Sequence, residues 1–136
     1  MTIPFSGGCA CGAVRYECTA EPIMALNCHC RDCQRASGGA YASGLFVPGP
    51  ALRLTKGEPK FHTVIAESGA KASRGFCSEC GSPVLARNSA HPMLVVFAAS
   101  LDDPSWHNPT MDIWTSKAQP WDHLDPNRLR YARGFE

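Results

Sequence analysis

Apolar and polar positions alternate along several short segments of the chain. Residues 13–18 and 41–47 alternate with a period of two, which is the pattern of a β-strand with one buried face. Other short segments, rich in β-branched or apolar residues, predict strands at 52–55, 61–66, 82–87 and 93–99. The last of these is apolar throughout, so it predicts a buried central strand.

Glycine and proline interrupt the chain so often that long helices have little room. The sequence holds 12 glycines and 11 prolines among 136 residues. The best helix candidate is one or two turns at residues 31–37, stopped by Gly38 and Gly39. No repeat, low-complexity tract or linker divides the chain. We therefore predict a mainly β fold of short strands with little helix, in a single domain spanning residues 1–136.

The charge of the chain excludes several classes of partner. The formal net charge is +1, and no basic run is longer than a pair of residues, so the electrostatic footprint of a nucleic-acid or acidic-membrane binder is missing. No segment approaches the ~20 apolar residues of a membrane span. The opening residues MTIPFSGG lack the charged and apolar regions of a secretory signal. We expect a cytoplasmic protein with no nucleic-acid partner and no membrane partner.

Seven of the eight cysteines lie in three short clusters. The clusters are Cys9-x-Cys11, Cys28-x-Cys30-x-x-Cys33 and Cys77-x-x-Cys80, while Cys18 continues the alternation of a strand and is predicted to be a core thiol. Cytosolic thiols are kept reduced, so a framework of disulfides is not expected. Clustered short spacings in an intracellular chain instead indicate metal ligation.

The clusters divide most simply into two metal sites. Cys77 and Cys80, followed by Gly81, have the spacing of a zinc knuckle, and glycines flank the Cys9–Cys11 segment so that it can bend sharply. These four thiolates would complete a closed structural zinc site. The remaining three, Cys28, Cys30 and Cys33, would leave one position open, which is the signature of a catalytic zinc.

A second division of the cysteines is also compatible with the spacing. Cys9 and Cys11 could join Cys28 and Cys30, which leaves Cys33 with the 77–80 pair. We prefer the first division because it keeps each local cluster whole. Three thiolates make zinc a weaker Lewis acid than three imidazoles do, so binding a thiol as its thiolate is the more natural chemistry. This favours the making or breaking of a carbon–sulfur bond on a thiol such as glutathione.

The order of the sequence motifs resembles that of a known family. The segments GGCACGAVRY, CHCRDCQRASGGAYAS, TKGEP and RGFCSECGSPV, in that order, resemble the glutathione-dependent formaldehyde-activating family, which includes centromere protein V. The resemblance runs from about Gly7 to residues 114–121. It implies a mainly β, Mss4-like zinc-binding fold, with two zinc ions per chain divided as preferred above. It also implies the condensation of glutathione with formaldehyde to S-(hydroxymethyl)glutathione, formally the reaction of a carbon–sulfur lyase.

Candidate substrate contacts flank the three-cysteine cluster. Arg31 and Arg35 could bind the carboxylates of a thiol substrate, or they could be solvated or balance the anionic zinc–thiolate cluster. Ser37 and Tyr41 could line the pocket. His29 could shuttle protons, although its place between alternating ligands predicts that its side chain points away from the metal.

The alternative to an enzyme is an interaction module in which both zinc ions are structural. Such a module would hold all its zinc tightly and would ignore thiols, whereas an enzyme would have one loosely held zinc in a concave site.

Overall fold

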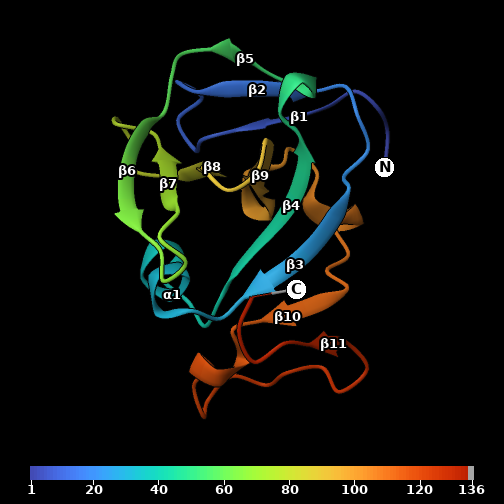
Figure 1. Cartoon of the computed structure of the whole chain (residues 1–136). Coiled ribbons are helices and arrows are strands. Elements are labelled where there is room, and N and C mark those ends of the chain that lie inside the picture. The colour runs from blue at the N-terminus through green and yellow to red at the C-terminus, as the bar shows by residue number, and fades with distance from the viewer. Residues whose placement is uncertain (135–136) are drawn as a thin grey trace.

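The computed structural model describes residues 1–134, which fold into two β-sheets and one α-helix (Figure 1). The strands of the smaller sheet, in spatial order, are β1 (Phe5–Gly8), β2 (Arg15–Cys18) and β5 (Leu52–Lys56). Those of the larger sheet, in spatial order, are β11 (Leu129–Arg130), β10 (Met111–Ile113), β3 (Met24–Cys28), β4 (Ala42–Pro48), β9 (Met93–Phe97), β8 (Pro83–Asn88), β7 (Lys71–Phe76) and β6 (Lys60–Ile65). The helix is α1 (Arg31–Ser37), and single 3₁₀ turns lie at Gly49–Ala51, Ala98–Ser100, Pro104–Trp106 and Thr115–Lys117.

The predicted fold class is confirmed, because 40% of the chain is in strands and there is a single short α-helix in the described part. The predicted helix at 31–37 coincides with α1, which ends at Gly38 in the left-handed conformation with φ 74°. The apolar segment 93–99 is central as predicted, since β9 lies between β4 and β8. It is only partly buried, however, with Val96 as its fully enclosed residue.

All the strand pairs are antiparallel except those of β10, which runs parallel to both β3 and β11. In Figure 1 the smaller sheet lies at the top, α1 lies beside the β6–β7 hairpin, and the β10–β11 segment lies at the bottom. This arrangement brings the C-terminal segment against the end of β3, where α1 begins.

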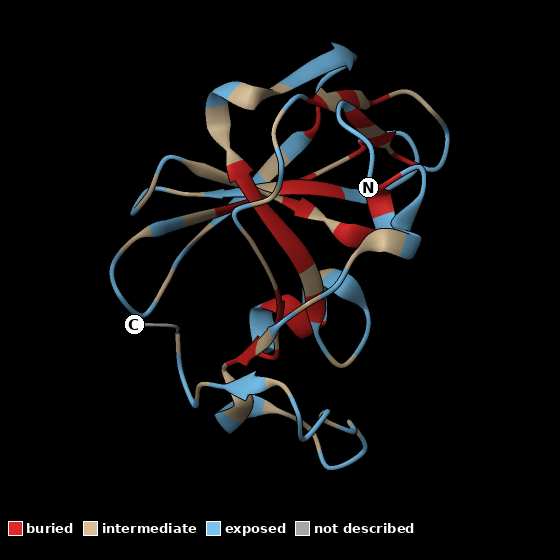
Figure 2. Ribbon diagram, turned by 90° about the vertical axis from the view of Figure 1, so that its right-hand side faces the viewer, coloured by how far each residue is buried: buried red, intermediate tan, exposed pale blue. Residues whose placement is uncertain are grey.

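The main core is built from side chains of both sheets. Tyr16 of β2 and Leu45, Val47 and Val96 of the larger sheet are almost fully buried in one cluster. The Tyr16 hydroxyl lies 2.7 Å from the Ser100 hydroxyl, so its polar end is satisfied. Figure 2 shows these buried segments in the middle of the molecule and mostly exposed residues toward the C-terminus.

A smaller apolar cluster occupies the opposite face of the larger sheet. Successive residues of a strand point to opposite faces, so Phe46 turns away from Leu45 and packs with Leu26 and Ile113. Cys28, Trp114 and Tyr131 contact this second cluster. The predicted core role of Cys18 agrees with its complete burial in the main core.

Among the described residues, no helix has both the length and the apolar character needed to cross a bilayer.

Candidate metal centres

The first cysteine cluster joins two loops that are far apart in the sequence. Cys9 and Cys11 lie between β1 and β2, and Cys77 and Cys80 lie between β7 and β8. Their four Sγ atoms all lie within 4.8 Å of one another. The Sγ atoms of Cys9 and Cys11 are 3.7 Å apart, and those of Cys11 and Cys77 are 3.8 Å apart.

These separations fit a metal held by four thiolates. A zinc–sulfur bond of about 2.3 Å in a tetrahedron places neighbouring sulfurs about 3.8 Å apart. The donor set is all sulfur, which zinc prefers in closed sites. The structure thus brings together the same four cysteines that the preferred division of the sequence grouped.

The two loops form the turns that such a site requires. Gly81 has φ 77°, and its N–H donates to the Cys77 carbonyl at 2.8 Å. The Glu79 N–H approaches the Cys77 sulfur at 3.4 Å, and the Val14 N–H approaches the Cys9 sulfur at 3.3 Å. These amide donors stabilise thiolates. Hydrogen bonding from Ser82 likewise lowers the pKa of Cys80 to about 5.

The second cluster lies where β3 ends and α1 begins. Cys28 is the last residue of β3, Cys30 caps the helix, and Cys33 lies within it. Their sulfurs lie within 4.8 Å of one another, and the Cys33 N–H donates to the Cys30 sulfur at 3.3 Å. Hydrogen bonds from the Cys28 and Cys33 thiols lower the pKa of Cys30 to about 2.

Arg74 of β7 is the cation that contacts the second cluster. Its Nη2 lies 3.4 Å from the Cys33 sulfur, and the side chain is partly buried. Sequence reasoning expected a cation here but considered only the nearest ones along the chain, Arg31 and Arg35. The guanidinium of Arg31 donates to the Gln34 side chain, and Arg35 is exposed in the last turn of α1. The position of Arg74 just before the Cys77 knuckle carried no local signal of this contact.

Of the two other predicted substrate residues, Tyr41 lines a pocket and Ser37 does not. The Ser37 hydroxyl donates to the Tyr41 carbonyl at 2.8 Å, and the Tyr41 ring lies 5.2 Å from the ring of His29. Tyr41 and His29 line a pocket of about 350 Å³ together with Asp112 and Asp122. The structure therefore places Tyr41 against His29, and its role in substrate binding stays a prediction.

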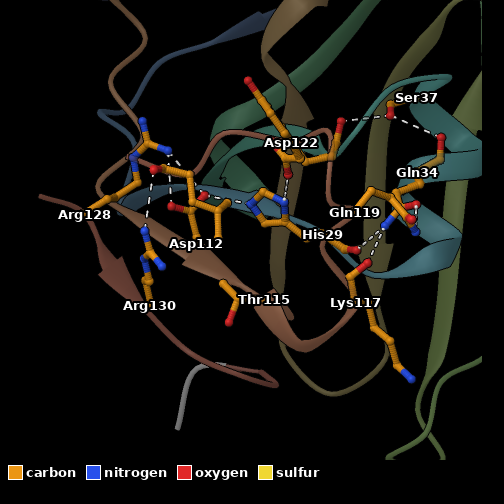
Figure 3. A network of polar contacts seen from close by, with 12 residues as sticks. His29, Gln34, Ser37, Asp112, Thr115, Lys117, Gln119, Asp122, Arg128 and Arg130 are labelled. Carbon is orange, nitrogen blue, oxygen red and sulfur yellow. Dashed lines mark hydrogen bonds and ion pairs between the residues drawn. The ribbon is translucent and has the colours of Figure 1, made fainter. Parts of the chain in front are cut away.

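His29 is fully buried, and both of its ring nitrogens contact carboxylates (Figure 3). Nε2 lies 2.8 Å from Asp112 and Nδ1 lies 2.7 Å from Asp122. Neither aspartate was predicted from the sequence, because each is more than 80 residues away along the chain. With both nitrogens engaged by carboxylates, the ring has no free nitrogen to offer a metal or a substrate.

A family model shows which family the chain belongs to. The model for "Glutathione-dependent formaldehyde-activating enzyme" matches residues 4–117, which is most of the chain and includes all seven clustered cysteines. The protein is therefore a member of the glutathione-dependent formaldehyde-activating family, as the resemblance of its motifs predicted.

One curated relative and one solved structure extend this comparison. A Halomonas elongata protein named "Putative glutathione-dependent formaldehyde-activating enzyme" is 33% identical over 104 residues, which cover 71% of this chain and 64% of that relative. The chain thus matches somewhat less than two thirds of the relative's length. The crystal structure of a Rhodobacter sphaeroides protein superposes with a TM-score of 0.57 at 21% identity, over 93% of this chain and 98% of that one. This second likeness shows the fold alone.

Proposed function

We propose that the protein is a zinc-dependent enzyme that joins the thiol of glutathione to formaldehyde. The observation that carries this proposal is the second cluster, in which three thiols converge with Arg74 on one side. Within residues 1–134 no fourth cysteine, histidine, aspartate or glutamate joins that group of donors. Three protein ligands leave a position for a substrate atom, whereas the four-thiol cluster is complete and suits a structural role.

The proposed reaction is the addition of a thiol to an aldehyde. The glutathione sulfur attacks the carbonyl carbon and forms a carbon–sulfur bond, the C=O π pair moves to oxygen, and the thiol proton ends on that oxygen. The product is S-(hydroxymethyl)glutathione, and the reverse reaction is that of a carbon–sulfur lyase. A zinc ion bound by the second cluster would supply the Lewis acidity that keeps a substrate thiol deprotonated.

The residues of this chain divide the remaining tasks. Cys28, Cys30 and Cys33 would hold the ion, and the guanidinium of Arg74 would offset the negative charge that three thiolates accumulate. Arg31 and Arg35 stay candidates for the glutathione carboxylates, and Ser37 and Tyr41 stay candidates for the pocket wall. Family membership supports the thiol and aldehyde substrates, because the family is described by glutathione and formaldehyde.

Binding calorimetry with two matched ligands tests the thiol. Glutathione should bind the zinc-loaded protein, and S-methylglutathione, which keeps both carboxylates but has no thiol, should bind at least tenfold more weakly. The Cys33→Ser variant should lose this discrimination. Equal affinity for the two ligands would show that the protein does not recognise the thiol of glutathione.

Turnover is tested by nuclear magnetic resonance with ¹³C-labelled formaldehyde. The wild-type protein should speed the appearance of S-(hydroxymethyl)glutathione above the uncatalysed rate, and Cys33→Ser should not. The alternative is the interaction module with two structural zinc ions. It is supported if the protein holds two zinc ions tightly, binds no thiol and does not change the rate at which S-(hydroxymethyl)glutathione forms.

A further inference from the structure

His29 is held at every polar group it possesses. Its backbone N–H donates to the Ile113 carbonyl at 3.0 Å, and its carbonyl accepts from the Gln34 side-chain amide at 2.7 Å. Its two ring nitrogens contact Asp112 and Asp122, as described above. Because His29 lies between Cys28 and Cys30 in the chain, these contacts fix the backbone that spaces two sulfurs of the second cluster.

Three of these four partners come from the C-terminal strap, which we define as residues 111–134. Gln34 links α1 to the same segment, since its amide also donates to the Lys117 carbonyl at 3.0 Å and its side-chain oxygen accepts from Gln119 at 3.2 Å (Figure 3). The strap therefore holds the loop of the second cluster at two points, His29 and Gln34.

The strap is itself closed by hydrogen bonds between its two ends. The Tyr131 N–H donates to the Asp112 carbonyl at 2.9 Å, and the Trp114 N–H donates to the Arg133 carbonyl at 2.9 Å. Arg128 reaches back to the Asp112 carboxylate at 3.2 Å. Asp122 lies on the loop between these ends, so its position depends on the strap being closed.

The polar side chains of this network are buried and paired. Each ring nitrogen of His29 lies within hydrogen-bonding distance of an aspartate, and the guanidinium of Arg128 contacts Asp112. The side chains of His29, Asp112 and Asp122 are 1%, 0% and 5% exposed. Buried networks in which every member is paired are rigid, and loss of one member leaves a buried polar partner without its contact.

We infer that the strap is a positioning element that sets how tightly the second cluster holds its metal, acting through His29 and Gln34. The inference rests on the proposed metal site at Cys28, Cys30 and Cys33. The family match ends at residue 117, so Asp122, Gln119 and Arg128 belong to the part of the chain beyond it. Coupling of this kind is reciprocal, so a metal at the second cluster should also tighten the strap.

The test compares two aspartates on the same strap loop. Asp122→Ala removes a contact to His29. Asp125→Ala removes a half-exposed carboxylate that accepts from the Asn127 amide at 2.9 Å within its own loop and lies 3.9 Å from Arg128. Metal affinity at each site is measured with cobalt(II), whose absorption reports thiolate ligation, in competition with a chelator. We expect Asp122→Ala to weaken the second site roughly tenfold to a hundredfold, the range seen when groups that orient metal ligands are changed. The first site, and both sites of Asp125→Ala, should keep the wild-type affinity.

Hydrogen exchange supplies a readout that a purely structural role would not move. In the wild type, loading the second site should slow exchange of the strap amides of Trp114 and Tyr131, and Asp122→Ala should abolish that dependence. Should Asp122→Ala fail to fold, Asp122→Asn keeps the shape and removes only the charge, and it should also weaken the second site. The inference about the strap is overturned if the Asp122 variants bind cobalt at the second site with wild-type affinity. It is also overturned if metal loading does not change hydrogen exchange in the strap. Either result leaves the proposed metal site standing. A wild type that binds no second cobalt overturns the proposed metal site, and the inference with it.

Discussion

Substituting one cysteine in each cluster separates a structural site from an open one. The first cluster joins residues 9–11 to residues 77–80 and so ties the β1–β2 loop to the β7–β8 loop, whereas the second spans only residues 28–33. A crosslink between distant segments stabilises the fold far more than one that closes six residues. Cys80→Ser should therefore lower the stability of the fold strongly, and Cys33→Ser should lower it much less.

The magnitude follows from the depth of the first cluster. Cys9 and Cys77 are 7% and 1% exposed and belong to the main core, so metal binding there is coupled to core packing. Structural zinc contributes on the order of 10 kcal/mol in small domains, which is comparable to the whole stability of ~5–15 kcal/mol. Losing even half of it, at roughly 3–5 °C per kcal/mol for this size, lowers the midpoint by about 15–25 °C.

Cys33→Ser should lower the stability of the fold much less than Cys80→Ser. It removes a buried sulfur and its contact with Arg74, a change that typically costs about 1–2 kcal/mol, or roughly 3–10 °C. Thermal unfolding followed by circular dichroism in excess zinc measures both variants. Cys11→Ser should behave like Cys80→Ser, and Cys28→Ser like Cys33→Ser. If Cys33→Ser destabilises as much as Cys80→Ser, the assignment of the open site is wrong.

Three further predictions concern metal content, charge and pH. Protein purified without chelator should carry close to two zinc ions per chain by elemental analysis, and one or none would contradict the two-site interpretation. Arg74→Ala should weaken cobalt binding at the second cluster about thirtyfold, the equivalent of ~2 kcal/mol for a partly buried charge partner, whereas Arg35→Ala should leave it unchanged; equal losses would remove the specific role of Arg74. Burial lowers the pKa of His107 below its usual 6.5, so the unfolded chain takes up this proton first and stability falls as pH drops below about 6.5. Between pH 7.5 and pH 5.5, the free energy of unfolding measured in urea should fall less in His107→Gln than in the wild type. Equal falls in the two proteins would refute this prediction.

Local spacing was enough to predict the short groups of neighbouring cysteines and the helix. Ligands two or three residues apart are brought together by a single bend, and residues 31–37 lie between a capping residue and a glycine stop. Strands without alternation were missed, as in β1 with its two glycines. Their pairing is decided by neighbours across the sheet, which one sequence does not reveal.

Contacts between distant segments account for what could not be predicted around the site. Arg74 reaches Cys33 because β7 lies beside α1 in the folded chain, although 41 residues separate them. Asp112 and Asp122 reach His29 because β10 pairs with β3 and the strap closes over the loop. These residues carry ordinary surface-type side chains, so only the tertiary arrangement distinguishes them. The roles of Arg31, Arg35, Ser37 and Tyr41 stay predictions.

The division of the first cluster between two distant loops also determines the order in which its ligands are synthesised. On the ribosome, Cys9, Cys11 and the three cysteines of the second cluster emerge before Cys77 and Cys80 exist. At ~5–20 residues per second, the 47 residues from Cys33 to Cys80 take roughly 2–10 seconds to translate. During that interval a metal ion meets six thiols, Cys18 and the five clustered ones, and a four-thiolate site that keeps to the clustered cysteines joins Cys9 and Cys11 to the 28–33 cluster. The second cluster can therefore bind metal during synthesis, whereas the first cluster acquires its native ligands only after Cys80, and an ion bound early between the two clusters has to exchange ligands.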